Sequence, residues 1–141
     1  MTEFIIRDRV LTKYNGCKKV VHIPYGVTEI GQSAFMDHNE IESVTLPDSI
    51  TDIGTNAFLG CDAMKSINIP QGVRKIDDNT FLCCESLEKI NLNFGLKTVG
   101  YGAFMNCKSL KSVSIPMSVT QICDDSFAVS CSTKKGVFDT Y

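Results

Sequence analysis

Hydrophobic residues return along this chain with a period of 23 residues. Phenylalanine marks the period most clearly, at Phe35, Phe58, Phe81, Phe104 and Phe127. Two aliphatic columns share it: Val21, Val44, Ile67, Ile90 and Val113, and two residues further on Ile23, Leu46, Ile69, Leu92 and Ile115. A fixed period of this length is typical of a solenoid in which every repeat forms one coil of a stack.

Each repeat contains the signals of two strands and a turn. Residues 43–46 alternate polar and apolar side chains, which is the period of a half-buried strand. Proline follows this strand in four repeats and ends it, because proline has no N–H for the next ladder bond; Asn93 replaces proline in the fourth repeat, where we expect a looser turn. A second short apolar segment follows. The Ala-Phe segment after it predicts one turn of α or 3₁₀ helix.

The two ends of the chain differ from the repeats. Residues 1–18 lack the period and contain two strand-like runs, which predict an N-terminal capping hairpin. We expect about five repeats over residues 19–131, the last one incomplete, and a tail or cap over residues 132–141, all within a single domain. Because that tail is short, self-association through the weakly capped C-terminal end is a further expectation.

The full repeat allows a comparison with a known family. Its second copy reads Ile41-x-x-Val44-x-Leu46-Pro47-x-x-Ile50-x-x-Ile53-Gly54-x-x-Ala57-Phe58-x-x-Cys61. This pattern resembles the BspA-type leucine-rich repeat over residues 20 to about 130. The resemblance implies a mainly β, right-handed solenoid with a parallel sheet on its concave face. It also implies a bacterial protein with a role related to adhesion, since members of the family are often surface proteins that bind host matrix proteins or other cells.

Composition narrows the partners and the location. Hydrophobic residues make up 43% of the chain and charged residues 21%, as in ordinary folded proteins. The net charge is −2 and no run of five basic residues occurs, which argues against nucleic acid as a partner. The first residues lack the apolar run of a secretory leader or a membrane span. We therefore expect a cytoplasmic protein, with the cell surface or secretion as the alternative if a leader has been removed.

Three of the seven cysteines keep the repeat period, in the column His38, Cys61, Cys84 and Cys107. Zinc binding is one interpretation, since histidine and cysteine are its usual ligands. Stacked coils would spread the four side chains over roughly 14 Å, too far for one ion. We therefore expect buried thiols that pack, with no metal and no cofactor. Only two histidines occur and no nucleophile motif is present, so we predict no catalytic residue and no enzyme.

The outward side of the predicted strands is the candidate binding surface. Its residues are small and polar: His22, Thr45, Asn68, Asn91 and Ser114. Two aromatic residues, Tyr25 and Phe94, lie in the turns that follow the strands, and aromatic side chains dominate protein interfaces. We predict a noncatalytic protein-interaction module that uses the concave sheet and these turns, with an unidentified protein partner. Packing between neighbouring turns would explain the two aromatic residues equally well.

Two other functions remain as alternatives. The chain could be a structural segment of a longer or self-associating repeat array, or a thiol or metal protein.

One further outward column alternates in charge, with Lys19, Glu42, Lys65, Glu88 and Lys111. Stacking in register would place each of these charges between opposite ones, which favours a single register of the strands.

Overall fold

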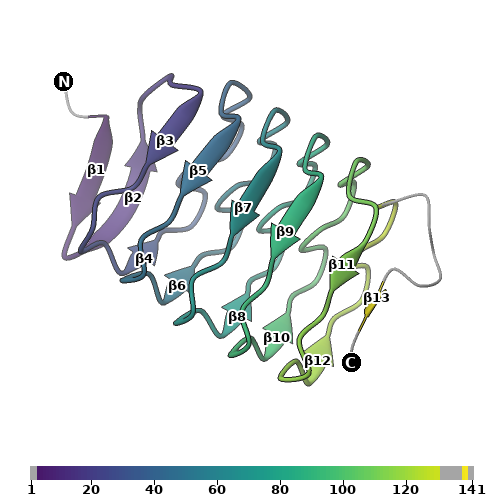
Figure 1. Cartoon of the computed structure of the whole chain (residues 1–141). Helices are drawn as coiled ribbons and strands as arrows, with labels where there is room; N and C mark the ends of the chain where they lie inside the picture. The colour runs from purple at the N-terminus through teal and green to yellow at the C-terminus, as the bar shows by residue number, and fades with distance from the viewer. Residues whose placement is uncertain (1–2, 131–137, 140–141) are drawn as a thin grey trace.

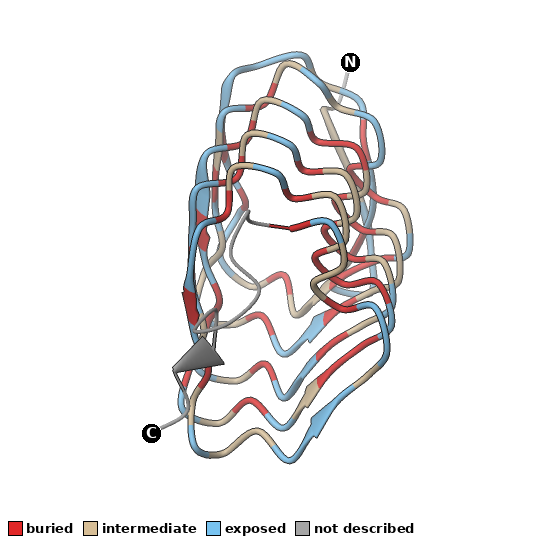
Figure 2. Cartoon of the chain, turned by 90° about the vertical axis from the view of Figure 1, so that its right-hand side faces the viewer, coloured by how far each residue is buried: buried red, intermediate tan, exposed pale blue. Residues whose placement is uncertain are grey.

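The chain winds into a stack of similar coils (Figure 1). The computed structural model describes residues 3–130 and the backbone of residues 138–139, and no helix occurs among them. Each repeat contributes one strand to a long-strand face, one shorter strand to a short-strand face, and a run of turns that returns the chain to the next coil. Seen along the stack, buried positions recur at the same places in successive coils (Figure 2). The predicted mainly β repeat solenoid is confirmed.

The long-strand face carries the strands that the polar and apolar alternation predicted. They are β3 (Val20–His22), β5 (Ser43–Thr45), β7 (Ser66–Asn68), β9 (Lys89–Asn91) and β11 (Val113–Ser114). The first four form one parallel sheet in register, so that Ile67 of β7 pairs with Ile90 of β9. The last strand, β11, is hydrogen-bonded to β13 (Phe138–Asp139) and not to β9. Strand β11 nevertheless lies against β9, so the long-strand face continues into the fifth repeat.

The short-strand face follows the second apolar column. Its strands are β4 (Glu29–Ile30), β6 (Asp52–Ile53), β8 (Lys75–Ile76), β10 (Thr98–Val99) and β12 (Gln121–Ile122). Parallel pairing joins β4 to β6 and joins β8, β10 and β12, while β6 and β8 are not paired. A glycine follows β6 and β10, but Asp77 follows β8. Glycine allows close approach there, because a Cβ on Gly54 would lie 2.8 Å from the Gln32 nitrogen of the preceding coil.

An antiparallel hairpin covers the first coil, as predicted. It consists of β1 (Phe4–Arg7) and β2 (Val10–Tyr14), joined by Asp8 and Arg9 with φ of 51° and 67°. The hairpin continues the short-strand face, since Leu11 of β2 pairs in parallel with Ile30 of β4. The long-strand face begins instead with β3, whose only neighbour in the described sheet is β5.

The Ala-Phe segments are successive turns in place of the predicted helical turn. In the second repeat, the Ala57 N–H donates to the Gly54 carbonyl at 3.1 Å and the Leu59 N–H to the Asn56 carbonyl at 3.2 Å. Two residues of this segment have positive φ, Asn56 at 61° and Gly60 at 77°. A right-handed helix needs consecutive residues with negative φ, so it cannot form through them.

Aromatic rings form a continuous column through the core. The phenylalanines stack face to face with centroid separations of 5.1 to 5.5 Å from Phe35 to Phe127. Tyr14 of the hairpin extends this aromatic column, with its ring 5.1 Å from that of Phe35, and Phe4 packs beyond it at 5.4 Å. The hairpin is thus joined to the core by the same stacking that joins the repeats to one another.

The C-terminal part of the chain is described only at β13. This strand pairs in parallel with β11, with Val113 opposite Phe138. The rest of the expected tail or cap, residues 132–137 and 140–141, lies outside the described residues. The proposed division of the chain at residues 18 and 131 stays a prediction.

Candidate functional site

The periodic cysteines are buried hydrogen-bond donors. The Cys61 thiol donates to the Phe35 carbonyl at 3.2 Å, and the Cys84 thiol to the Phe58 carbonyl at 3.2 Å. Cys107 donates to the Phe81 carbonyl at 3.1 Å. Two polar residues of the same column act alike: His38 Nε2 bonds the Tyr14 carbonyl at 2.9 Å, and the Ser130 hydroxyl donates to the Phe104 carbonyl. The column therefore links each coil to the aromatic column of the preceding one.

Burial makes these thiols poor nucleophiles. It raises the pKa of Cys61 to about 12 and raises that of Cys84 well above its usual range. A thiolate is the reactive form, so both side chains stay protonated near neutral pH. No group of three or more His, Cys, Asp or Glu side chains in the described part of the chain is arranged to hold a metal ion. Cys17, between β2 and β3, is the exposed one among the cysteines of the described residues.

The predicted binding residues all lie exposed on the long-strand face. In register order they are His22, Thr45, Asn68, Asn91 and Ser114. The Asn91 side-chain amide donates to the side-chain oxygen Oδ1 of Asn68 on the neighbouring strand. The row therefore presents amides and hydroxyls at regular spacing along the stack. That these residues bind a partner stays a prediction.

The side chains in the turns that follow three of the long strands are highly exposed. Tyr25 is 84% exposed and Phe94 83% exposed, so neighbouring turns do not cover either ring. Met117, the next turn residue after Phe94, is 81% exposed and was not among the predicted site residues. The sequence signal for Met117 is that it occupies the same repeat position as Tyr25 and Phe94. Packing between turns, the alternative explanation of the aromatic residues, does not account for such exposure.

The turn that presents Phe94 is firmly held, contrary to the looser turn expected without proline. The buried Asn93 side chain donates to the Pro70 carbonyl at 2.6 Å and to the Val73 carbonyl at 2.9 Å. Its oxygen accepts the Gly95 N–H at 2.6 Å. Two of these hydrogen bonds thus fix the turn to the preceding repeat, and the third closes the turn itself. An exposed side chain on such a support is preorganised for contact.

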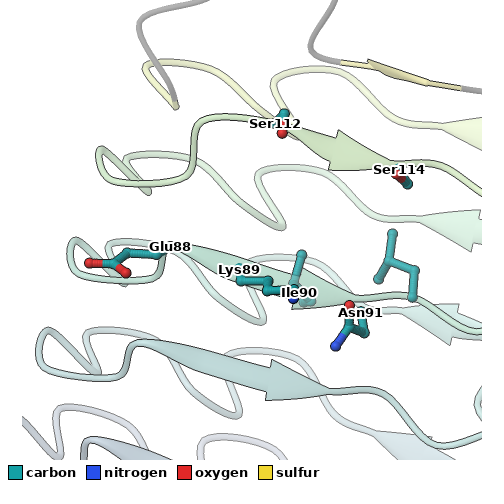
Figure 3. A pocket seen from close by; sticks show the side chains of 7 residues that line it. Glu88, Lys89, Ile90, Asn91, Ser112 and Ser114 are labelled. Atoms are coloured by element: carbon teal, nitrogen blue, oxygen red, sulfur yellow. The ribbon is translucent and has the colours of Figure 1, made fainter.

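A pocket of about 380 Å³ lies on the long-strand face over β9 and β11. Figure 3 shows side chains from the two strands around it. Its lining consists of Glu88, Lys89, Ile90, Asn91 and Leu92 from one repeat and Ser112 and Ser114 from the next. Two predicted residues, Asn91 and Ser114, therefore meet in one pocket, while His22 and Thr45 lie at the far end of the face.

Lys89 is a pocket residue that the sequence prediction left out of the candidate site. It is the one charged member of a column that otherwise contains Val20, Ser43, Ser66 and Ser112. A second hollow, of about 490 Å³, shares Glu88 with the pocket and is lined also by Lys108, Ser109 and Lys111. Three lysines and one glutamate line the two hollows together, so this region is positive although the whole chain carries −2.

The column that alternates in charge contributes Glu88 and Lys111 to these hollows. Its backbone is in register from Lys19 to Glu88. The Glu42 N–H donates to the Lys19 carbonyl at 2.7 Å, the Lys65 N–H to that of Glu42 at 3.0 Å, and the Glu88 N–H to that of Lys65 at 2.8 Å. Their side chains are exposed.

In the described structure, no helix is long and apolar enough to span a bilayer.

Comparison with known proteins agrees with this architecture. The profile of the BspA type leucine rich repeat region matches residues 6–134 in six copies. A leucine-rich repeat protein of T. pallidum is 31% identical, with a TM-score of 0.83, over 89% of this chain and 63% of its own. One from Bacteroides ovatus is 34% identical, with a TM-score of 0.75, over 84% of this chain and 33% of its own. No curated protein matches the chain significantly.

The fold also occurs in the pneumococcal vaccine antigen PcpA, with a TM-score of 0.69 at 20% identity, over 97% of this chain and 47% of that one. The chain spans less than two thirds of the length of each of these three proteins. The six copies agree with the six rings from Tyr14 to Phe127 that stack through the described core. The profile, the 23-residue period and the parallel coils together show that the chain belongs to the BspA-type leucine-rich repeat family.

Proposed function

We propose that this chain is a noncatalytic protein-binding module whose contact surface is the long-strand face with the turns that follow it. The observation that carries the proposal is the exposure of Tyr25, Phe94 and Met117, each above 80%, on the edge of a row of small polar side chains. Exposed aromatic anchors next to hydrogen-bonding groups are the composition of protein interfaces. The partner is a protein.

The side chains on this face support binding without catalysis. Asn68 and Asn91 bond to each other, and the row otherwise offers hydroxyls and one histidine, His22. The second histidine, His38, lies apart from this row and bonds the Tyr14 carbonyl and the Glu40 carboxylate, each at 2.9 Å. The face therefore supplies hydrogen bonds and contact area without pairing a nucleophile with a base.

A long charged side chain in the middle of the face tests the proposal. Once an interaction screen has identified a protein partner, Asn68→Arg should weaken its binding about tenfold or more, because the arginine stands in the contact surface. Thr51→Arg is the matched control, since Thr51 is exposed on the short-strand side of the coil. Titration calorimetry measures both variants. Equal affinity of Asn68→Arg and the parent chain would overturn the proposal.

End-to-end association is a second candidate, favoured by the last coil. Ile122 of β12 is 40% exposed, whereas its column partners Ile30, Ile53, Ile76 and Val99 are at most 1% exposed. A second copy stacked on this end would bury it. Sedimentation over a range of concentrations should show association that Ile122→Ser reduces. A strict monomer at high concentration would contradict this candidate.

A further inference from the structure

The charges on the short-strand side change sign along the stack. Glu29 of β4 pairs in register with Asp52 of β6, whereas Lys75 occupies the same place in β8. The residues just before β8 and β10 contribute Arg74 and Lys97, and the Lys97 N–H donates to the Arg74 carbonyl at 2.7 Å. The first two repeats are therefore acidic on this side, and the next two are basic.

Ion pairs among the described residues do not offset this division. Lys75 contacts Asp77, with 3.4 Å between Nζ and Oδ1. Glu29, Arg74 and Lys97 join no ion pair within that part of the chain. Acidic and basic side chains thus remain available to a partner of complementary charge.

The order of the signs reverses when the stack is turned end for end. From the first repeat to the fourth, the short-strand side is acidic, acidic, basic and basic. Two copies packed antiparallel on this side, about a two-fold axis between the second and third repeats, therefore set every acidic repeat opposite a basic one. Glu29 of one copy faces the repeat of Lys97, and Asp52 faces the repeat of Lys75.

Both ends of the stack follow the same reversal. Arg9 of the hairpin precedes Glu29, whose N–H donates to the Arg9 carbonyl at 3.4 Å, and Asp124 follows β12 in the last coil. Antiparallel copies bring the basic end against the acidic one. The division is also present in the sequence, where residues 20–64 contain no lysine or arginine and residues 89–123 contain no aspartate or glutamate.

The two exposed aromatic turns stand at matching places. Tyr25 belongs to the first repeat and Phe94 to the fourth, so the same axis sets them opposite each other. Their turns lie beside the short strands along the lower side of the stack (Figure 1), and a Cβ added to Gly95 would lie 3.3 Å from the Arg74 guanidinium. The aromatic and charged side chains therefore form one surface. An apolar contact bordered by complementary charges is the composition of a protein interface.

We propose that two copies of this chain associate antiparallel through this surface, with Tyr25 against Phe94 of the second copy and Glu29 against its Lys97. The contact is closed, because each copy supplies both halves of it, and association stops at a dimer. This inference goes beyond the proposed function, since a second copy covers the two aromatic turns. The row from His22 to Ser114 stays open to another protein.

Sedimentation of the intact chain over a range of concentrations tests the dimer. The parent chain should dimerise at low salt and dissociate as salt is added. Glu29→Lys and Lys97→Glu should each raise the dissociation constant about tenfold or more, because each variant sets like charges opposite each other at two places. An equimolar mixture of the two variants should recover the parent affinity, since both contacts of the mixed dimer join opposite charges. Lys65→Glu is the matched control, because Lys65 is an exposed lysine beside β7 on the long-strand face.

The outcomes are separate from those of the proposed function. Asn68→Arg lies on the long-strand face and should leave the dimer intact, whereas Thr51→Arg should weaken it, because Thr51 faces the repeat of Arg74 in the second copy. A strict monomer at low salt, or a mixture of the two charge variants that associates no better than each alone, would overturn the inference. Association that Ile122→Ser abolishes and Lys97→Glu leaves unchanged would also overturn it, and would place the contact at the end of the stack.

Discussion

A buried thiol in the periodic column gives this protein a pH response that an exposed thiol would not. Burial raises the pKa of Cys61 to about 12 in the folded chain. Below about pH 8.5 the thiol is protonated in both the folded and the unfolded chain, so its contribution to stability is constant. Above that pH the unfolded chain loses the proton first, and the free energy of unfolding falls until the pH reaches the folded pKa.

Cys61→Ser measures this contribution by difference. Serine retains a donor for the Phe35 carbonyl, as Ser130 does for the Phe104 carbonyl. We expect the substitution to cost less stability at pH 10 than at pH 7, by about 1–2 kcal/mol, because only the parent chain carries the raised thiol pKa. Urea denaturation of both proteins at the two pH values gives the difference. A cost of the substitution that does not change with pH would contradict the prediction.

Glycine is needed after β6 for space and not for its φ. A Cβ on Gly54 would lie 2.8 Å from the Gln32 backbone nitrogen, which cannot move without separating the coils. Gly54→Ala should therefore lower the free energy of unfolding by about 1–3 kcal/mol in urea denaturation. Gly95→Ala is the control, since its added Cβ would meet no atom closer than 3.3 Å, and we expect a change within about 0.5 kcal/mol. Equal costs for the two variants would exclude close approach as the reason.

Among the elements, the N-terminal hairpin depends on Tyr14. The ring lies between Phe4 and Phe35, and its hydroxyl accepts the Lys18 N–H at 3.2 Å. Tyr14→Ala should destabilise the protein by about 3–5 kcal/mol, because it empties one position of the aromatic column. Tyr14→Phe keeps the ring and should cost about 1 kcal/mol. Thermal unfolding followed by circular dichroism ranks the variants, and a Tyr14→Ala protein as stable as Tyr14→Phe would show that the hairpin does not depend on stacking.

The strands could be predicted from the sequence because stacking in register gives each repeat the same side-chain environment. Val44 and Ile67 are buried for the same reason, and one repeat predicts the next. The place of Tyr14 in the aromatic column could not be predicted in this way, because Tyr14 stands 21 residues before Phe35 and not 23. The positive φ values of the turns also have a signal in the sequence. They include Asn56, Asn79 and Asn106, and asparagine tolerates that conformation better than most residues do.

The candidate site was predictable only in part. The row from His22 to Ser114 follows from alternation along the strands, and its exposure follows as well. The pocket over β9 and β11 does not follow, because Ser112 of the fifth repeat is the same residue type as Ser43 and Ser66 of the other repeats. Lys89 is distinguished by lining that pocket, and Met117 by its exposure in the turn.

At the scale of the whole molecule, stability depends on the register of the stack. Contacts in a solenoid join neighbouring coils, so removal of one complete repeat should shorten the stack without abolishing it. Deletion of residues 47–69 joins Leu46 to Pro70 and keeps every column in register. Deletion of residues 70–92 does the same through Ile69 and Asn93.

Both deletions should fold cooperatively, with a urea m-value lower by roughly a fifth, because each exposes one coil less on unfolding. Deletion of residues 47–58 breaks the register and should not fold, since it places Leu59 where Pro47 ends a strand. Urea denaturation of the three deletion proteins tests this. If the protein without residues 47–58 unfolds as cooperatively as the other two, the stack does not depend on the 23-residue register.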